Sequence, residues 1–137
     1  MILNEELFNL DPFSIKLEKK ERIFKKYINE LNLHHYKNSN DYKKLLKFLN
    51  FNKKKVYDIK DAPFLPVRLF KEVELKSIKE SAIIKVLNSS GTSDSSLSKI
   101  FLDNQNSNSQ SKSLSLIMQS ILGKKRVPML IVDKNSK

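Results

Sequence analysis

The residues best suited to chemistry in this sequence surround Gly91, in the segment LNSSGTSDSSLSKIFLD at positions 87–103. A glycine permits backbone conformations in which successive amide groups point toward one anion. The neighbouring hydroxyls are short donors that reach phosphate oxygens, and Lys99 can add a positive charge. We therefore predict a polyphosphate-binding loop. Its candidate ligand-binding residues are Ser89, Ser90, Gly91, Thr92, Ser93 and Lys99.

An ordinary turn is the alternative interpretation of this segment, because Ser, Asn and Gly also satisfy local backbone groups in turns. Two common nucleotide-binding motifs are excluded. The chain has glycines only at Gly91 and Gly123, so a GxGxxG motif is impossible. A Walker A loop needs a second glycine followed by Lys and Ser or Thr, and the sequence has no such run.

Apolar, strand-forming residues lie on both sides of this loop. The segments 82–87 and 100–102 predict two strands, and the residues from Asn88 to Ser98 form the loop between them. The preceding segment, 72–78, is compatible with either a short helix or a strand. The sequence thus predicts a strand-loop-strand hairpin that presents the candidate phosphate-binding residues.

Helical patterns dominate the first part of the chain. A short helix is expected at 4–10, followed by a long amphipathic helix that begins with Asp11 as N-cap and Pro12 in the first turn. A loop is expected at 33–39, and Ser39 or Asn40 then caps a helix at 41–49. His34 and His35 fall in the predicted loop. Adjacent histidines rarely chelate one metal ion without further ligands, so no metal site is predicted.

Two prolines, Pro63 and Pro66, exclude a regular helix from the connection at 57–71. The apolar side chains of this connection require burial, so we expect an ordered crossing that attaches the helices to the sheet. These side chains are Phe64, Leu65, Val67, Leu69 and Phe70. We therefore predict one domain over 1–137, with a helical region at about 1–56 and a sheet-containing region at about 57–137.

The last part of the chain predicts a helix at 107–122, stopped by Gly123, and a buried strand at 127–133. A core strand so near the end of the sequence suggests a sheet that continues in further sequence. Together the patterns predict the α/β class. The apolar residues of the predicted helix face are Leu114, Ile117, Met118, Ile121 and Leu122.

Composition limits the classes of function. The 137 residues include no cysteine, which excludes disulfides, thiolate metal sites and a cysteine nucleophile within this sequence. The first residues do not resemble a signal peptide, and no apolar run is long enough for a membrane span, so we expect a cytoplasmic protein. The net charge of +11 is compatible with nucleic-acid binding, but the lysines alternate with Glu and Asp, which favours a solvated helix surface.

Several segments together resemble the N-terminal part of the acyl-protein synthetases, which belong to the adenylate-forming superfamily with acyl-CoA synthetases and phenylacetate-CoA ligases. The similarity covers nearly the whole chain. The matching segments are DPF at 11–13, the region of His35, Ser39 and Tyr42, APFLPVRLFK at 62–71, the segment 87–103, Gln110, and RVPMLIVD at 126–133.

This resemblance implies the N-terminal portion of an adenylate-forming ligase domain that uses ATP and Mg²⁺. The Ser/Thr/Gly-rich loop would hold the β- and γ-phosphates while a fatty-acid carboxylate attacks the α-phosphorus, giving an acyl-adenylate and pyrophosphate. The acyl group would then pass to a cysteine of the synthetase and to a reductase partner. Residues 89–93 match the family's phosphate loop, and Lys99 matches its basic residue.

The sequence departs from the family pattern in two ways. Asp94 replaces the second glycine of the loop, and a carboxylate there repels phosphates unless it points away or helps to hold Mg²⁺. The sequence also ends before the adenine-binding segments, the catalytic lysine and the acyl-accepting cysteine. We therefore expect an N-terminal fragment that holds no catalytic residue and does not complete catalysis alone. The alternatives are an inactive truncated product, a split product whose missing part is on another chain, and a small basic nucleic-acid-binding protein.

Overall fold

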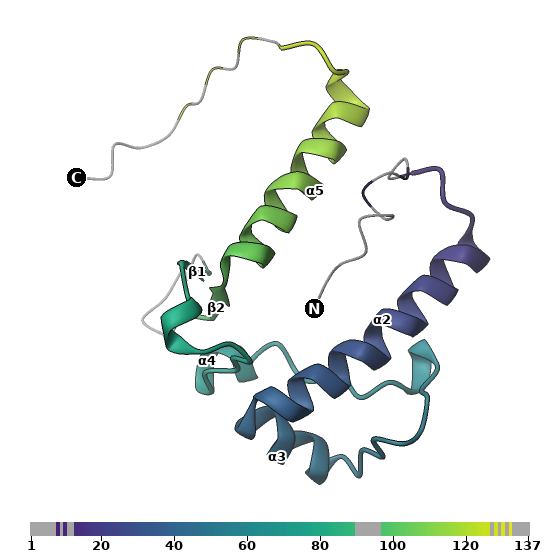
Figure 1. The fold of residues 1–137 in the computed structure, drawn as a ribbon, viewed down its shortest axis with the longest axis vertical. Coiled ribbons are helices and arrows are strands. Elements are labelled where there is room, and N and C mark those ends of the chain that lie inside the picture. Colours follow the sequence, from purple (N-terminus) through teal and green to yellow (C-terminus); the bar gives the residue numbers. More distant parts are fainter. Residues whose placement is uncertain are drawn as a thin grey trace.

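A computed structural model describes residues 8, 10, 13–89, 97–126, 128, 130 and 132 of the chain. It combines helices with one two-stranded antiparallel sheet, a mixed architecture compatible with the predicted α/β class (Figure 1). In chain order the described elements are α2 (Leu17–Asn38), α3 (Asn40–Phe48), the 3-10 helix η1 (Ile59–Asp61), α4 (Leu69–Glu72), the 3-10 helix η2 (Glu80–Ala82), β1 (Lys85–Asn88), β2 (Lys99–Leu102) and α5 (Asn104–Leu122).

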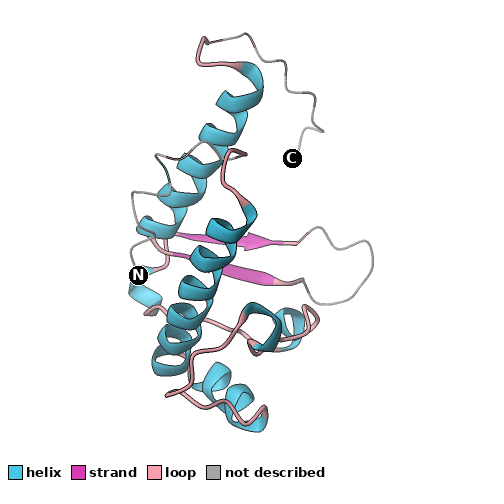
Figure 2. Cartoon of the chain, turned by 90° about the vertical axis from the view of Figure 1, so that its right-hand side faces the viewer, coloured by secondary structure: helices cyan, strands magenta, loops and turns pink. Residues whose placement is uncertain are grey.

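The two long helices, α2 and α5, slope the same way in Figure 1, with α3 at the lower end of α2 and the sheet at the lower end of α5. The strands cross the direction of these helices (Figure 2). α2 contacts α3 and η1, whereas α4 and α5 both contact β2. The connection between η1 and α4 therefore joins a helical part to the sheet, as the sequence predicts.

The two strands predicted on either side of the loop are confirmed as a pair, although β1 begins later than expected, at Lys85, and includes Asn88. β1 and β2 pair in antiparallel register, from Lys85 opposite Leu102 to Asn88 opposite Lys99. The expected loop runs from Asn88 to Ser98, and its residues 90–96 lie outside the described part of the chain. Most of the short helix predicted at 4–10 also lies outside it. The buried strand predicted at 127–133 is wrong for the residues described there, since Pro128, Leu130 and Val132 are not in a strand, and Leu130 and Val132 are each 89% exposed.

Helix α2 differs from the prediction at both ends. It begins at Leu17, later than the expected cap at Asp11 and Pro12, because Lys16 is still extended, with ψ at 146°. At the other end, the loop predicted at 33–39 is wrong, since α2 continues to Asn38. Contacts with distant parts of the chain hold this last turn in place. The ring of His35 lies 5.5 Å from that of Tyr42, and Tyr36 lies 5.9 Å from Phe51.

Helix α3 follows α2 directly and supplies the most buried side chain of the described core. Ser39 is its N-cap and accepts a hydrogen bond from the amide of Tyr42 at 3.4 Å, as one of the two predicted caps. Leu46 is fully buried at 0% exposure. The Tyr42 hydroxyl donates to Oδ1 of the buried Asn32 at 2.6 Å, which ties α3 to α2 through a polar contact inside the interface.

The connection after α3 is held against α2 by one amide side chain. Asn29 accepts a hydrogen bond from the backbone N–H of Tyr57 and donates to the Tyr57 carbonyl, both at 2.8 Å. The Asn29 side-chain amide therefore makes the two hydrogen bonds to the Tyr57 backbone that a residue of a neighbouring β-strand would make. The Tyr57 ring stacks on Phe51 at 5.3 Å, and its hydroxyl accepts from the amide of Asn52 at 2.8 Å. These contacts make Tyr57 one of the buried residues of the described core.

The proline-containing connection is less buried than the sequence predicts. Phe64 and Val67 are exposed, at 82% and 76%, so the expectation that they are buried is wrong for both. Leu65, Leu69 and Phe70 are only partly exposed. Leu69 and Phe70 are the first two residues of α4. Because α4 contacts β2, these two side chains are partly covered.

Helix α5 confirms the predicted helix and begins earlier, at Asn104, because Asp103 is its N-cap and accepts from the amide of Asn106 at 2.7 Å. Gly123 ends it with a positive φ of 79°, a conformation that favours glycine. The predicted apolar face of α5 is exposed in the described structure. Among the described residues, no helix has both the length and the apolar character needed to cross a lipid bilayer.

Candidate functional site

The root of the predicted phosphate loop is closed by two hydrogen bonds beyond the last strand pair. The amide of Ser89 donates to the carbonyl of Ser98 at 3.1 Å, and the amide of Ser98 donates to the Ser89 hydroxyl oxygen at 3.1 Å. In the described part of the chain the Ser89 hydroxyl oxygen acts as an acceptor. The loop at 90–97 thus starts and ends at one fixed point of the hairpin.

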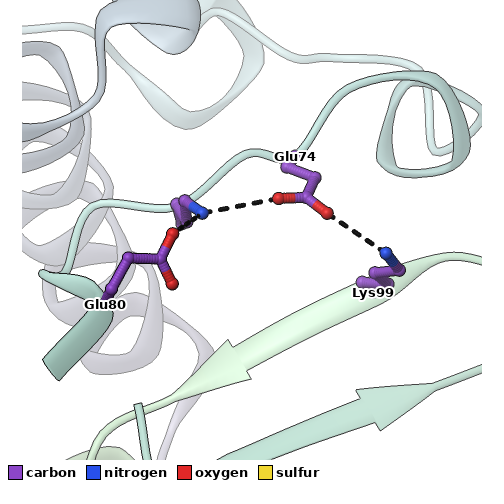
Figure 3. A network of polar contacts seen from close by, with 4 residues as sticks. Glu74, Glu80 and Lys99 are labelled. Carbon is purple, nitrogen blue, oxygen red and sulfur yellow. Dashed lines mark hydrogen bonds and ion pairs between the residues drawn. The ribbon is translucent and has the colours of Figure 1, made fainter. Parts of the chain in front are cut away.

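Lys99 lies at this root, opposite Asn88 in the strand register. Its Nζ atom lies 3.1 Å from Oε1 of Glu74, a carboxylate from the segment that follows α4. The other oxygen of Glu74 lies 3.4 Å from Nζ of Lys76, and Lys76 also pairs with Glu80. Figure 3 shows the chain of alternating charges that results, from Lys99 through Glu74 to Glu80.

The pairing changes the acid–base behaviour of these groups. The hydrogen bond from Lys99 is the largest cause that lowers the pKa of Glu74, followed by the hydrogen bond from Lys76. The hydrogen bond to Glu80 is the largest cause that raises the pKa of Lys76. Near neutral pH, Glu74 is therefore ionised and Lys76 is protonated. Both Lys99 and Glu74 are about half exposed, at 51% and 52%, so an incoming anion can reach Lys99 from solvent.

A cavity of about 420 Å³ opens beside the root of the loop. Lys99 and Lys71 contribute positive charge to its lining, Glu72 and Glu74 contribute negative charge, and Asn88 contributes an amide. Phe70, Val73 and Leu97 complete it. The lining offers hydrogen-bond donors and cations beside the loop, which suits the terminal phosphates of a nucleotide, provided that Lys99 can leave Glu74.

The structure places two of the six sequence-predicted site residues. Ser89 and Lys99 lie together at the root of the hairpin. Ser90, Gly91, Thr92 and Ser93, and also Asp94, lie outside the described residues. Sequence reasoning missed Lys71 and Glu74 as members of the site. Lys71 belongs to the APFLPVRLFK segment, which was available as a signal, whereas nothing in the sequence indicates that Glu74 pairs with Lys99.

A second polar pair lies deeper, between α2 and the segment after α4. Nδ1 of His35 lies 2.7 Å from the hydroxyl oxygen of Ser77, although the two residues are 42 positions apart. Burial is the main cause that lowers the pKa of His35, and the neighbouring His34 lowers it further. The His35 imidazole is therefore neutral at neutral pH. His34 itself contacts Asn38 in the next turn of α2.

Groups of three or more His, Asp or Glu side chains placed to hold a metal ion are absent from the described ranges. The cations that line the cavity beside the hairpin are Lys99 and Lys71, and ammonium groups are of the kind that can bind phosphate oxygens.

Comparisons with known proteins give one match. No curated protein and no solved structure matches the chain. The model of the family described as "Acyl-protein synthetase, LuxE" matches residues 2–137. This match covers nearly the whole sequence and confirms the resemblance seen in its motifs. The chain therefore belongs to the LuxE family of acyl-protein synthetases.

Proposed function

We propose that the chain provides the phosphate-binding part of an ATP-dependent acyl-protein synthetase. In this proposal the loop residues 89–93 and Lys99 bind the β- and γ-phosphates of Mg²⁺-ATP. A fatty acid or related carboxylate attacks the α-phosphorus, and the products are an acyl-adenylate and pyrophosphate. The family match supports the ligase class, and the resemblance of the loop supports the nucleotide.

The observation that carries this proposal is the position of Lys99, opposite Asn88 in the last strand pair before the Ser89–Ser98 closure of the hairpin. The hairpin brings the two ends of the loop together at Ser89 and Ser98. A lysine at the same point supplies the charge that stabilises the leaving pyrophosphate. The cavity beside it is large enough to admit part of a nucleotide.

Binding of the anion requires an exchange of partners at Lys99. Without a ligand, its ammonium group is paired with Glu74. In the proposed complex, a phosphate oxygen replaces the Glu74 carboxylate, and Lys76 remains to neutralise Glu74. After the exchange, Lys76 pairs with both Glu74 and Glu80, so the part of the network that remains in Figure 3 carries one excess negative charge, which opposes the exchange.

The later steps are proposed from the family alone. The acyl group would be transferred to a cysteine of the complete synthetase and then to a reductase partner, which forms the aldehyde. This sequence contains no cysteine, so the acceptor cysteine would belong to sequence outside these 137 residues. The proposed role of the present chain is accordingly to bind ATP and position its phosphates.

Calorimetry of Mg²⁺-ATP binding tests the proposal, with the Lys99→Ala variant as the decisive change. Loss of one charge-assisted hydrogen bond should weaken binding by about tenfold. Lys85→Ala is the matched control, because Lys85 is an exposed lysine at the other end of the same hairpin. Equal affinity in the wild type and Lys99→Ala, or no binding by the folded wild-type protein, would contradict the proposal.

A further inference from the structure

The contact between His35 and Ser77 has the form of a base paired with a nucleophile. The 2.7 Å distance between Nδ1 and the hydroxyl oxygen is that of a strong hydrogen bond, and the two side chains come from α2 and from the segment between α4 and η2. When Nε2 carries the ring proton, Nδ1 accepts the hydrogen of the Ser77 hydroxyl. A serine bound in this way can lose its proton as it attacks.

The pair lines a cavity of about 300 Å³ whose walls are partly apolar and partly polar. His35 and Ser77 both line it, and so do Lys76 and Asn106, whose N–H groups are of the type that stabilises negative charge on an acyl oxygen. Its apolar lining residues are Leu31, Phe70, Leu75, Ile78, Ile100 and Phe101. The apolar part of the lining offers a surface to a short hydrocarbon chain, and His34, Lys99 and Asp103 add further polar groups to the same cavity.

The protonation state of His35 agrees with the role of a base. Its partial burial disfavours the charged imidazolium, and the ring of Tyr42 packs against it at 5.5 Å in an edge arrangement. The neutral ring is the form that can accept a proton near neutral pH. His34 lacks a hydroxyl partner of this kind in the described structure, since its ring nitrogen contacts only the Asn38 amide there.

We infer that Ser77 is an acyl-accepting nucleophile, activated by His35, that reacts with activated carboxylic acid derivatives carrying an apolar chain. This goes beyond the proposed ATP site, because it places an acyl acceptor on a chain that has no cysteine. The inference also does not depend on nucleotide binding, since any activated acyl donor can transfer its acyl group to Ser77.

The step balances without a further reagent. The Ser77 oxygen attacks the acyl carbon and forms a new C–O bond, while the hydroxyl proton moves to Nδ1 of His35. The bond from the acyl carbon to the leaving group then breaks, and the leaving group takes its electron pair and the proton from His35. The product is an acyl ester on Ser77. The rival explanation is that the hydrogen bond only holds the segment after α4 against α2.

The test is to incubate the full chain with p-nitrophenyl hexanoate, measure the release of p-nitrophenolate, and locate the acyl group by mass spectrometry. Hydroxylamine cleaves esters and leaves amides, so it separates acylated serine from acylated lysine. The variants are Ser77→Ala, Ser77→Cys and His35→Gln. Ser81→Ala is the matched control, because Ser81 is an exposed serine of η2 outside the described lining of this cavity.

The expected result is a hydroxylamine-sensitive ester on Ser77, absent from Ser77→Ala and formed at least about tenfold more slowly in His35→Gln. Ser81→Ala should behave like the wild type. Ser77→Cys should accept the acyl group as a thioester, which keeps the test decisive if Ser77→Ala is poorly folded. Acylation confined to lysines in a folded wild-type protein, or a Ser77 ester formed equally fast in His35→Gln, would overturn the inference. Calorimetry with ATP separates this outcome from failure of the proposed function.

Discussion

Nζ of Lys99 and Oε1 of Glu74 lie 3.1 Å apart, which brings together a residue of β2 and one of the segment after α4. This ion pair joins the hairpin to the connection that precedes it. The ion pair also engages the ammonium group of Lys99, which the proposed phosphate site needs. Nucleotide binding at the hairpin should therefore depend on Glu74 even though a carboxylate cannot itself bind phosphate.

Glu74→Gln should strengthen the binding of Mg²⁺-ATP by up to about fivefold, because an exposed ion pair of this kind competes only weakly with the nucleotide for Lys99. The variant releases Lys99 and removes a negative charge from the cavity. Calorimetry measures the change. Glu72→Gln is the control, since Glu72 lines the same cavity but pairs with Arg68. An equal gain in both variants would show that general charge, and not the pair with Lys99, controls affinity.

Gly91→Val should abolish most nucleotide binding, because a β-branched side chain disfavours the positive φ and the close backbone approach that we predict for the loop. This expectation rests on the sequence, as Gly91 lies outside the described residues. His34→Ala should leave binding nearly unchanged, since His34 contacts Asn38 on the surface of α2. Similar affinities for the two variants, measured by the same calorimetry, would remove the loop as the binding site.

Leu46→Ala should lower the free energy of unfolding by about 2–5 kcal/mol, as expected for a large apolar side chain removed from a packed core. Leu46 is fully buried between α3 and its neighbours, whereas Leu49 is 44% exposed. Leu49→Ala is therefore the matched control and should cost much less. Urea unfolding followed by circular dichroism gives both values, and equal losses would contradict the described packing.

The stability of the fold should fall as the pH drops below about 6.5. Burial lowers the pKa of His35 from its ordinary value of 6.5, so in this range the unfolded chain binds a proton that the folded chain does not. The free energy of unfolding consequently increases as the pH rises through this window. The contribution of His35 to stability is lost at lower pH. His35→Gln should flatten this part of the profile, as measured by thermal unfolding at several pH values. A profile unchanged in the variant would remove His35 as the cause.

Local signals predicted the elements that depend on local chemistry. Ser39 caps α3 and Gly123 ends α5, since a hydroxyl acceptor and a residue tolerant of positive φ act on their own neighbours. The hairpin could also be predicted, because two short apolar runs flank one polar loop. For the same reason Ser89 and Lys99 could be expected near each other, at the two ends of that loop.

Contacts between distant segments could not be predicted. The sequence around His34 and His35 reads as a loop, yet α2 continues through it because His35 meets Ser77 and Tyr42. Glu74 is 25 residues from Lys99, and no local pattern indicates their pairing. Phe64 was expected to be buried because it is a large apolar residue. It is exposed because it precedes α4, the element that contacts the sheet.

The ion pair at the hairpin root also has a consequence for ionic strength. Added salt screens the attraction between ATP and Lys99, and it equally screens the attraction between Glu74 and Lys99 that competes with the nucleotide. The two effects oppose each other. The affinity for ATP should therefore vary less with salt in the wild type than in a chain without Glu74, so the network of Figure 3 makes the site tolerant of changes in the ionic medium.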